Sequence, residues 1–229
     1  MIKTVSLVIA LIFAVLITAF PVNAQEGNRA VYSSNSKEKK KIALTFDDGP
    51  HPKNTPKIIS ILEENDVKAT FFVIGVNAKN YPEALKLVSE KGHEIGNHTY
   101  SHGIIRGKSL KSIAREVIEA EEEIKDLTGV STNLLRPPCG LYDDTTVSFA
   151  QENGYKIVLW NIDTLDWEHS SVSDIISTVT GGVKGGDIIL FHDYISGENN
   201  TFEALKQIIP ILKNKGYEFV TVSELLQNL

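Results

Sequence analysis

Strand-like and helix-like segments alternate about seven times along this 229-residue chain, and the links between them are short. Apolar and β-branched runs such as residues 42–44, 69–74 and 188–191 are each followed by a stretch whose apolar residues recur every three or four positions. Such alternation is typical of βαβ units, in which parallel strands are joined by right-handed helical crossovers. The pattern therefore predicts an α/β fold with a parallel sheet and helices outside it.

Polar motifs follow at least five of the expected strands, each where the strand ends. An open doubly wound sheet would spread these motifs along one edge, whereas a (β/α) barrel gathers the C-terminal ends of its strands into one mouth. We therefore expect a barrel with its functional site at that mouth. Residues 41–229 are short for eight strand-helix units, so the barrel should be distorted.

The first 24 residues have the pattern of a secretory signal peptide. Lys3 precedes an apolar run over residues 5–20, and the small residue Ala24 marks the expected cleavage position. An uncleaved N-terminal membrane anchor is the alternative, because the run approaches the roughly 20 apolar residues that span a bilayer. Residues 25–40 are polar and are expected to form a linker. One folded domain is then expected over residues 41–229, secreted or held at the cell surface.

Charge and cysteine content exclude some classes of protein. The formal net charge is −6 without a basic stripe, which argues against nucleic acid as a partner. Cys139 is the only cysteine, so no intramolecular disulfide can form. The domain is long enough to fold on a single hydrophobic core, and we expect a monomer.

Two adjacent aspartates, Asp47 and Asp48, stand between a buried strand and the turn residues Gly49 and Pro50. Successive side chains of a strand point to opposite faces, so the pair can serve two different targets. Two neighbouring carboxylates repel each other unless a cation or an arginine lies nearby. A solvated turn after a strand is the alternative interpretation.

His98 and His102 are four residues apart, a spacing that places two imidazoles on one side of a helical turn. Together with one carboxylate of the aspartate pair they would form a site of two histidines and one carboxylate, with a position open for water, as catalytic zinc requires. Cobalt or nickel would also suit these ligands. The alternative is that both histidines only cap and pack a loop.

Five short motifs follow one another along the chain: Thr45–Pro50, His98-Thr99-x-x-His102, Arg136-Pro-Pro-x-Gly140, Asp163-x-x-Asp166-Trp167 and Leu190-x-His192. With their flanking strands and helices they cover residues 41–229. In this order they resemble the motifs of the polysaccharide deacetylase family, also known as the NodB homology domain or carbohydrate esterase family 4.

This resemblance implies a metal-dependent hydrolase with assigned roles for the aspartates and histidines. Asp47 matches the general base and Asp48 the carboxylate ligand of a divalent metal, most simply zinc, with cobalt possible. His98 and His102 match the other two ligands. His192 matches the general acid that protonates the leaving amine.

The resemblance also assigns the supporting residues. Arg136 matches the arginine that pairs with the base, and Asp166 matches the carboxylate that orients the general acid. Trp167 and Leu190 match the apolar walls that receive the acetyl methyl group. Amide hydrolysis also needs a donor to the oxyanion, and a backbone N–H of the 136–140 turn is the expected one.

One position departs from the family pattern. The family usually has an aromatic residue at position 139, where this chain has Cys139. The backbone N–H survives that change, whereas the wall facing the sugar loses a large flat side chain. Tyr142, just after this motif, is a second candidate for contact with a sugar ring, although packing explains it equally well.

These residues predict a secreted, metal-dependent deacetylase that removes N-acetyl groups from amino-sugar polymers. Peptidoglycan N-acetylglucosamine is the first expected substrate and chitin oligosaccharides are the second. The alternatives are an O-acetyl esterase of the xylan type, a catalytically inactive wall-binding module on the same fold, and an amidase of small cyclic amides.

Overall fold

The computed structural model describes residues 30–195, 197, 199–227 and 229. The expected signal peptide at residues 1–24 lies outside this range. None of the helices within it is long and apolar enough to cross a bilayer. The strands are β1 (Val31–Tyr32), β2 (Lys41–Asp47), β3 (Thr70–Val73), β4 (Glu94–Asn97), β5 (Leu134–Leu135), β6 (Lys156–Val158), β7 (Ile162–Asp163), β8 (Ile188–His192) and β9 (Glu218–Phe219). The helices are α1 (Asn54–Glu64), α2 (Gly75–Asn80), α3 (Pro82–Glu90), α4 (Leu110–Thr128), α5 (Asp144–Glu152), α6 (Val172–Gly182), α7 (Thr201–Asn214) and α8 (Val222–Leu225).

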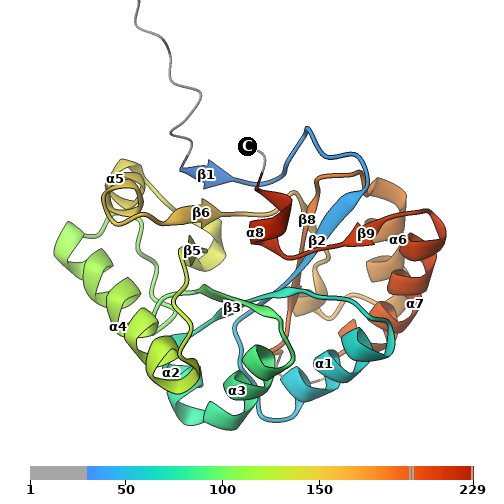
Figure 1. Cartoon of the computed structure of the whole chain (residues 1–229), viewed down its shortest axis with the longest axis horizontal. Coiled ribbons are helices and arrows are strands. Elements are labelled where there is room, and N and C mark those ends of the chain that lie inside the picture. Colours follow the sequence, from blue (N-terminus) through green and yellow to red (C-terminus); the bar gives the residue numbers. More distant parts are fainter. Residues whose placement is uncertain (1–29, 196, 198, 228) are drawn as a thin grey trace, which may run out of the picture.

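All the strand pairings between these elements are parallel, in the order β1-β6-β5-β4-β3-β2-β8-β7, and β9 adds to the start of β2. Figure 1 shows the helices α1 to α7 in an arc around the outside of this curved sheet. Within the described residues the two end strands, β1 and β7, do not pair with each other, so the barrel is incompletely closed. The predicted distorted (β/α) barrel is confirmed. The sheet has more strands than the expected seven units, because two-residue strands such as β1 and β7 leave no readable pattern.

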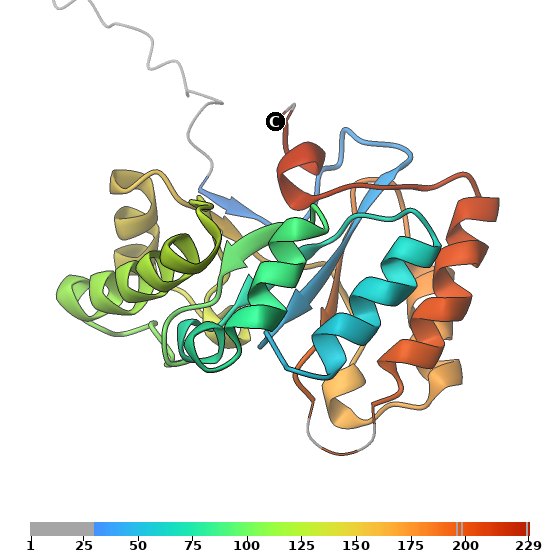
Figure 2. The same ribbon diagram turned by 60° about the horizontal axis from the view of Figure 1, so that its bottom comes forward.

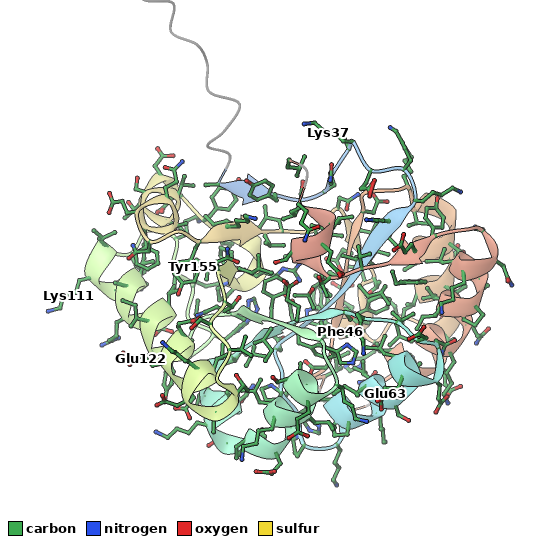
Figure 3. All side chains as sticks on the ribbon, viewed as in Figure 1. Lys37, Phe46, Glu63, Lys111, Glu122 and Tyr155 are labelled. Carbon is green, nitrogen blue, oxygen red and sulfur yellow. The ribbon has the colours of Figure 1, made fainter. Side chains whose placement is uncertain are left out.

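Strand β2 shows how the sequence divides the core into two layers. Ile42, Leu44 and Phe46 belong to the cluster that packs under the outer helices. The alternate residue Ala43 belongs to a separate cluster on the inner face of the sheet. This follows from the two-residue period of a strand, which sends successive side chains to opposite faces. Figure 3 shows Phe46 enclosed in the interior, whereas Lys111 of α4 points away from the molecule.

Helix α8 closes the inner face at the N-terminal ends of the strands. Val222 and Leu225 pack with Ala43 and Phe72 in the inner cluster. The backbone N–H of Val222 donates to Oγ1 of Thr70, the first residue of β3, at 2.9 Å. In Figure 2, α8 lies on the same side of the molecule as β1. With this end filled, the inner face is left accessible at the C-terminal ends of the strands.

The predicted polar linker over residues 25–40 needs correction in its described part. Val31 and Tyr32 form β1, which pairs with Ile157 and Val158 of β6. Asn35 is 1% exposed, and its Nδ2 donates to the backbone oxygen of Leu225 at 2.7 Å. The folded domain therefore begins before Lys41. Composition does not indicate this earlier start of the domain, because strand pairing and one buried amide can hold a polar segment that contributes few apolar residues.

Candidate active site

The register between β2 and β8 brings the first and last motifs together. Asp47 lies opposite His192, and Thr45 lies opposite Leu190. Residues opposite each other on neighbouring parallel strands point to the same face, and this face is the interior of the barrel. The base and the acid that the resemblance assigns therefore stand on adjacent strand ends at the mouth.

Asp47 is buried and paired with a buried arginine. Its Oδ1 accepts a hydrogen bond from Nη1 of Arg136 at 2.6 Å, and the exposed fractions of the two residues are 3% and 0%. Complete burial lowers the pKa of Arg136 from its ordinary value, while the charge of Asp47 opposes that shift. Because a guanidinium remains charged in proteins, Arg136 places a positive charge directly against the Asp47 carboxyl group inside the barrel.

The rest of the Arg136 side chain is also fully engaged. Its Nη1 donates to Thr45 Oγ1 at 2.8 Å, and its Nε and Nη2 donate to the backbone oxygens of Val158 and Leu159 at 3.1 and 3.0 Å. Its guanidinium carbon lies 3.9 Å from the ring centroid of Phe72. These contacts fix the direction from which Arg136 reaches Asp47.

Asp48 turns away from Asp47 and faces the two histidines. Its backbone has a φ of 75°, in the left-handed region, which aspartate tolerates better than most residues. Oδ1 of Asp48 lies 3.4 Å from Nε2 of His98 and 3.2 Å from Nε2 of His102. The aspartate pair therefore serves two targets, as the sequence predicted. Burial raises the pKa of Asp48, but contacts with His102 and His98 outweigh burial and bring it below its usual range.

The helical turn expected for residues 98–102 is wrong. These residues form a loop in which Thr99 and His102 have φ values of 67° and 59°. Oδ1 of Asn97 accepts from the backbone N–H of Thr99 at 2.9 Å and stabilises this path. Two left-handed residues thus bring the imidazoles together where a helical turn was expected, and their ring centroids are 5.0 Å apart.

The residues at this point fit a divalent metal ion. Asp48, His98 and His102 each offer a ligand atom, and these atoms all lie within 4.8 Å of one another. Oδ1 of Asp48 is buried without a hydrogen-bond partner in the described part of the chain, although buried carboxylate oxygens normally have one. Nδ1 of His98 lies 2.7 Å from the backbone oxygen of Arg136, which leaves Nε2 as the free ligand atom. A cation would satisfy all three groups at once.

His192 is held by a buried aspartate. Its Nδ1 lies 2.7 Å from Oδ1 of Asp166, whose Oδ2 accepts from the His192 backbone N–H at 2.9 Å and from Thr201 Oγ1 at 2.8 Å. Burial lowers the pKa of His192, but the hydrogen bond to Asp166 and the charges of Asp166, Asp47 and Asp48 outweigh it and raise the pKa to about 9. His192 is therefore a charged proton donor at neutral pH.

These groups surround one cavity of about 380 Å³. Its lining includes every predicted site residue except Arg136, Asp166 and Tyr142. Arg136 and Asp166 lie behind the cavity, where they contact Asp47 and His192. Tyr142 is 36% exposed, so its contact with a sugar stays a prediction. Cys139 is exposed at the rim. The lining residues are Asp47, Asp48, His98, His102, Cys139, Trp160, Asp163, Trp167, Leu190 and His192.

Trp160 and Asp163 were not among the predicted site residues, although both line the cavity. Asp163 lies within the fourth motif, and this position could have identified it as a site residue. Trp160 lies outside all five motifs, in the link that follows β6, which ends at Val158. Its ring is also 5.5 Å from the guanidinium carbon of Arg136. Only the curvature of the sheet shows that a residue in this link faces the mouth.

Comparison with known proteins decides the family. The model of the polysaccharide deacetylase family matches residues 34–158. A peptidoglycan-N-acetylglucosamine deacetylase of Bacillus cereus is 40% identical over 190 residues, covering 82% of this chain and 69% of that protein. A chitooligosaccharide deacetylase of Sinorhizobium fredii is 34% identical, covering 77% of this chain and 87% of that protein. The chain belongs to the polysaccharide deacetylase family.

Solved structures extend the match beyond residue 158. The crystal structure of a peptidoglycan N-acetylglucosamine deacetylase in complex with 4-naphthalen-1-yl-N-oxidanyl-benzamide has a TM-score of 0.84 and 38% identity, covering 88% of this chain and 94% of that chain. A family 4 acetyl xylan esterase of Clostridium thermocellum, solved with a cobalt ion, has a TM-score of 0.76 and 33% identity, covering 82% and 91%. The resemblance read from the five motifs is confirmed, and the His-His-Asp cluster of this deacetylase-family chain suits the family's dependence on a metal.

A buried carboxylate that the motifs do not include supports the turn that carries Asp48 in this deacetylase-family protein. Asp193 is 1% exposed, and its Oδ2 accepts from Thr55 Oγ1 at 2.5 Å. Thr55 Oγ1 in turn accepts from the backbone N–H of His51 at 2.8 Å. Burial raises the pKa of Asp193 to about 7, with the Thr55 hydrogen bond opposing it. Because the Asp193 carboxylate packs directly against Gly49, a Cβ at Gly49 would overlap it.

We expect Gly49→Ala to weaken metal binding. The new Cβ must displace Asp193 or the turn that carries Asp48, so the affinity for Zn²⁺ should fall about 10-fold or more, as it does when groups supporting a ligand are lost. Calorimetric titration of the apoprotein with Zn²⁺ measures this. Gly181→Ala in α6 is the matched control, because its Cβ would meet nothing within 4 Å. Equal affinities for the two variants would show that the contact with Asp193 does not position Asp48.

Proposed function

We propose that this protein is a secreted or cell-surface, metal-dependent deacetylase that hydrolyses N-acetyl groups of amino-sugar polymers, with peptidoglycan N-acetylglucosamine as first substrate and chitin oligosaccharides as second. One observation carries the proposal. A base held by Arg136 and an acid held by Asp166 face the same cavity, and a cluster fit for a metal lies beside the base. The polymer is the substrate class of its relatives, and the signal-like residues 1–24 supply the route to the cell wall.

Asp48, His98 and His102 would hold the metal, with zinc the first choice for two imidazoles and a carboxylate. A divalent ion in this position supplies a Lewis acid that polarises the acetyl carbonyl and lowers the pKa of water. Asp47 takes up the proton of the attacking water on its carboxylate. It can do so because its contact with Arg136 uses Oδ1, whereas Oδ2 lies 3.7 Å from His98 Nε2, on the side of the metal cluster.

The oxyanion needs a donor that is not already engaged. In the 136–140 turn the backbone N–H of Arg136 donates to Asn97 and that of Gly140 donates to Pro137, while both prolines lack an N–H. The N–H of Cys139 is then the candidate donor. Cys139 has a φ of 55°, a left-handed conformation that sets the direction of this N–H apart from that of an extended chain. The departure from an aromatic side chain at this position leaves the donor in place.

His192 protonates the leaving amine from its Nε2, because Nδ1 is occupied by Asp166. An amine is a poor leaving group unless it is protonated, so a charged histidine favours amide over ester hydrolysis. Leu190 and Trp167 line the same cavity as apolar surfaces suited to the acetyl methyl group. Leu190 is buried, whereas Trp167 is 48% exposed and is accessible to a bound sugar.

Acetate release tests the proposed reaction. The protein is stripped of metal with a chelator, re-supplied with Zn²⁺ or Co²⁺, and offered peptidoglycan, N-acetylglucosamine oligomers and acetylated xylan. We expect release from the amino-sugar substrates to disappear on chelation and to return with metal. Release from acetylated xylan alone would instead establish the O-acetyl esterase. Saccharide binding without any release from metal-loaded protein would establish an inactive wall-binding module.

The pH profile tests the role of His192. An acid with a pKa of about 9 stays protonated below that value, so on the alkaline side activity should fall as the pH rises through it. Asp166→Asn removes the charge that raises this pKa, and burial then lowers it. The alkaline limb of kcat/KM should move about two pH units or more towards acid. Both proteins carry the same metal, so the difference reports Asp166. The exposed Asp144→Asn is the matched control, and an unmoved limb in Asp166→Asn would rule out His192 as the titrating acid.

A further inference from the structure

A second hollow, of about 450 Å³, lies just after the loop over residues 98–102, which carries the proposed metal ligands His98 and His102 and is called the metal-binding loop below. Its lining begins at Gly103, the residue after the proposed ligand His102, and reaches Glu116 in the second turn of α4. We call it the 103–116 hollow. Because it starts one residue from the metal cluster, a polymer whose reacting sugar occupies the active-site cavity can extend towards it.

Three cationic side chains, Arg106, Lys108 and Arg115, line the 103–116 hollow. All three residues are exposed. The salt bridges found in the described part of the chain involve none of the three. They are therefore available to an anion from outside the chain, in a protein whose net charge is −6.

Glu116 is the one carboxylate among the lining residues, and it forms no ion pair with these three cations. Glu116 is bound by Ser101 of the metal-binding loop: its Oε2 accepts from the Ser101 backbone N–H at 2.9 Å, and its Oε1 accepts from Ser101 Oγ at 2.9 Å. The adjoining N-terminus of α4, capped by Ser109, adds the partial positive charge of a helix start. The hollow is thus positive next to an active site lined with carboxylates.

We propose that the 103–116 hollow binds a carboxylate of the substrate polymer, on a residue neighbouring the amino sugar that is deacetylated. Arginine side chains match a carboxylate through two parallel N–H groups. The inference rests on the proposed function and narrows it. It favours glycan strands that carry carboxylates on their lactyl and peptide substituents, as peptidoglycan does, over uncharged chitin oligosaccharides.

The test compares three glycans: peptidoglycan strands freed of phosphate-containing polymers, the same strands with their carboxyl groups converted to amides, and neutral N-acetylglucosamine oligomers. The variant is Arg106→Gln with Arg115→Gln. At low ionic strength its KM for the carboxylate-bearing strands should rise about 3- to 10-fold with little change in kcat, as expected for losing two exposed charge contacts. Its KM for the amidated strands and for the neutral oligomers should stay within twofold of the wild-type value.

The matched control removes two cations elsewhere on α4, Lys111→Gln with Lys125→Gln. Neither residue lines the 103–116 hollow, and Figure 3 shows Lys111 pointing into solvent at the outer end of the helix. A general effect of net charge would change KM equally in both double variants and would overturn the proposal. An equal effect of Arg106→Gln with Arg115→Gln on all three glycans, or none on any, would overturn it as well.

A binding titration separates this inference from the proposed function, because it needs no turnover. If the wild-type protein releases no acetate, the proposed function fails. The titration of the three glycans still tests whether the 103–116 hollow binds carboxylates. Tighter wild-type binding of carboxylate-bearing than of amidated strands, lost in Arg106→Gln with Arg115→Gln, would support it. Equal binding of both strands would overturn it. Circular dichroism of each variant establishes that it is folded, and the single Arg115→Gln variant replaces the double one if needed.

Discussion

The buried ion pair between Asp47 and Arg136 is the interaction on which the site depends. Taking two charges out of water costs several kcal/mol each, and that cost is offset only where the remaining donors are also satisfied. Arg136 meets this condition through Thr45, two backbone oxygens and the ring of Phe72. The pair links β2 to the end of β5 across the barrel interior, although β3 and β4 lie between them in the sheet. It therefore ties the curvature of the sheet to the position of the proposed base.

The pairing with Arg136 also separates the roles of the adjacent residues Asp47 and Asp48. Asp47 is the last residue of β2 and keeps its inward direction, while the left-handed backbone of Asp48 redirects the next carboxylate towards the histidines. The parallel register then sets His192 beside Asp47, and Asp166 raises its pKa. The proposed proton acceptor and the proposed proton donor are thus held at the same mouth, each by a partner behind the cavity.

The sequence was informative where a side chain belongs to a short local motif and silent where its partner is distant. The alternation of elements predicted the parallel sheet, and the polar motifs at the strand ends predicted the barrel. The five motifs contain every lining residue of the cavity except Trp160, together with Arg136 and Asp166 behind it. Thr201 and Thr55 were missed because each is an ordinary helix residue whose hydroxyl meets its carboxylate only after folding, 35 residues from Asp166 and 138 from Asp193. The spacing of His98 and His102 indicated proximity correctly but the wrong backbone, since left-handed residues are not readable from spacing. The 103–116 hollow has no motif at all, because its cations come from a loop and a helix face.

The most direct test of this account compares Asp47→Asn with Asp48→Asn in one measurement series of Zn²⁺ affinity and kcat. Asparagine can still accept the hydrogen bond from Arg136, so Asp47→Asn should bind the metal within a few-fold of the wild-type affinity and lose about 10²- to 10⁴-fold in kcat. Asp48→Asn should lose metal affinity itself. Loss of metal in Asp47→Asn, or full metal binding in Asp48→Asn, would contradict the division of roles between the two aspartates.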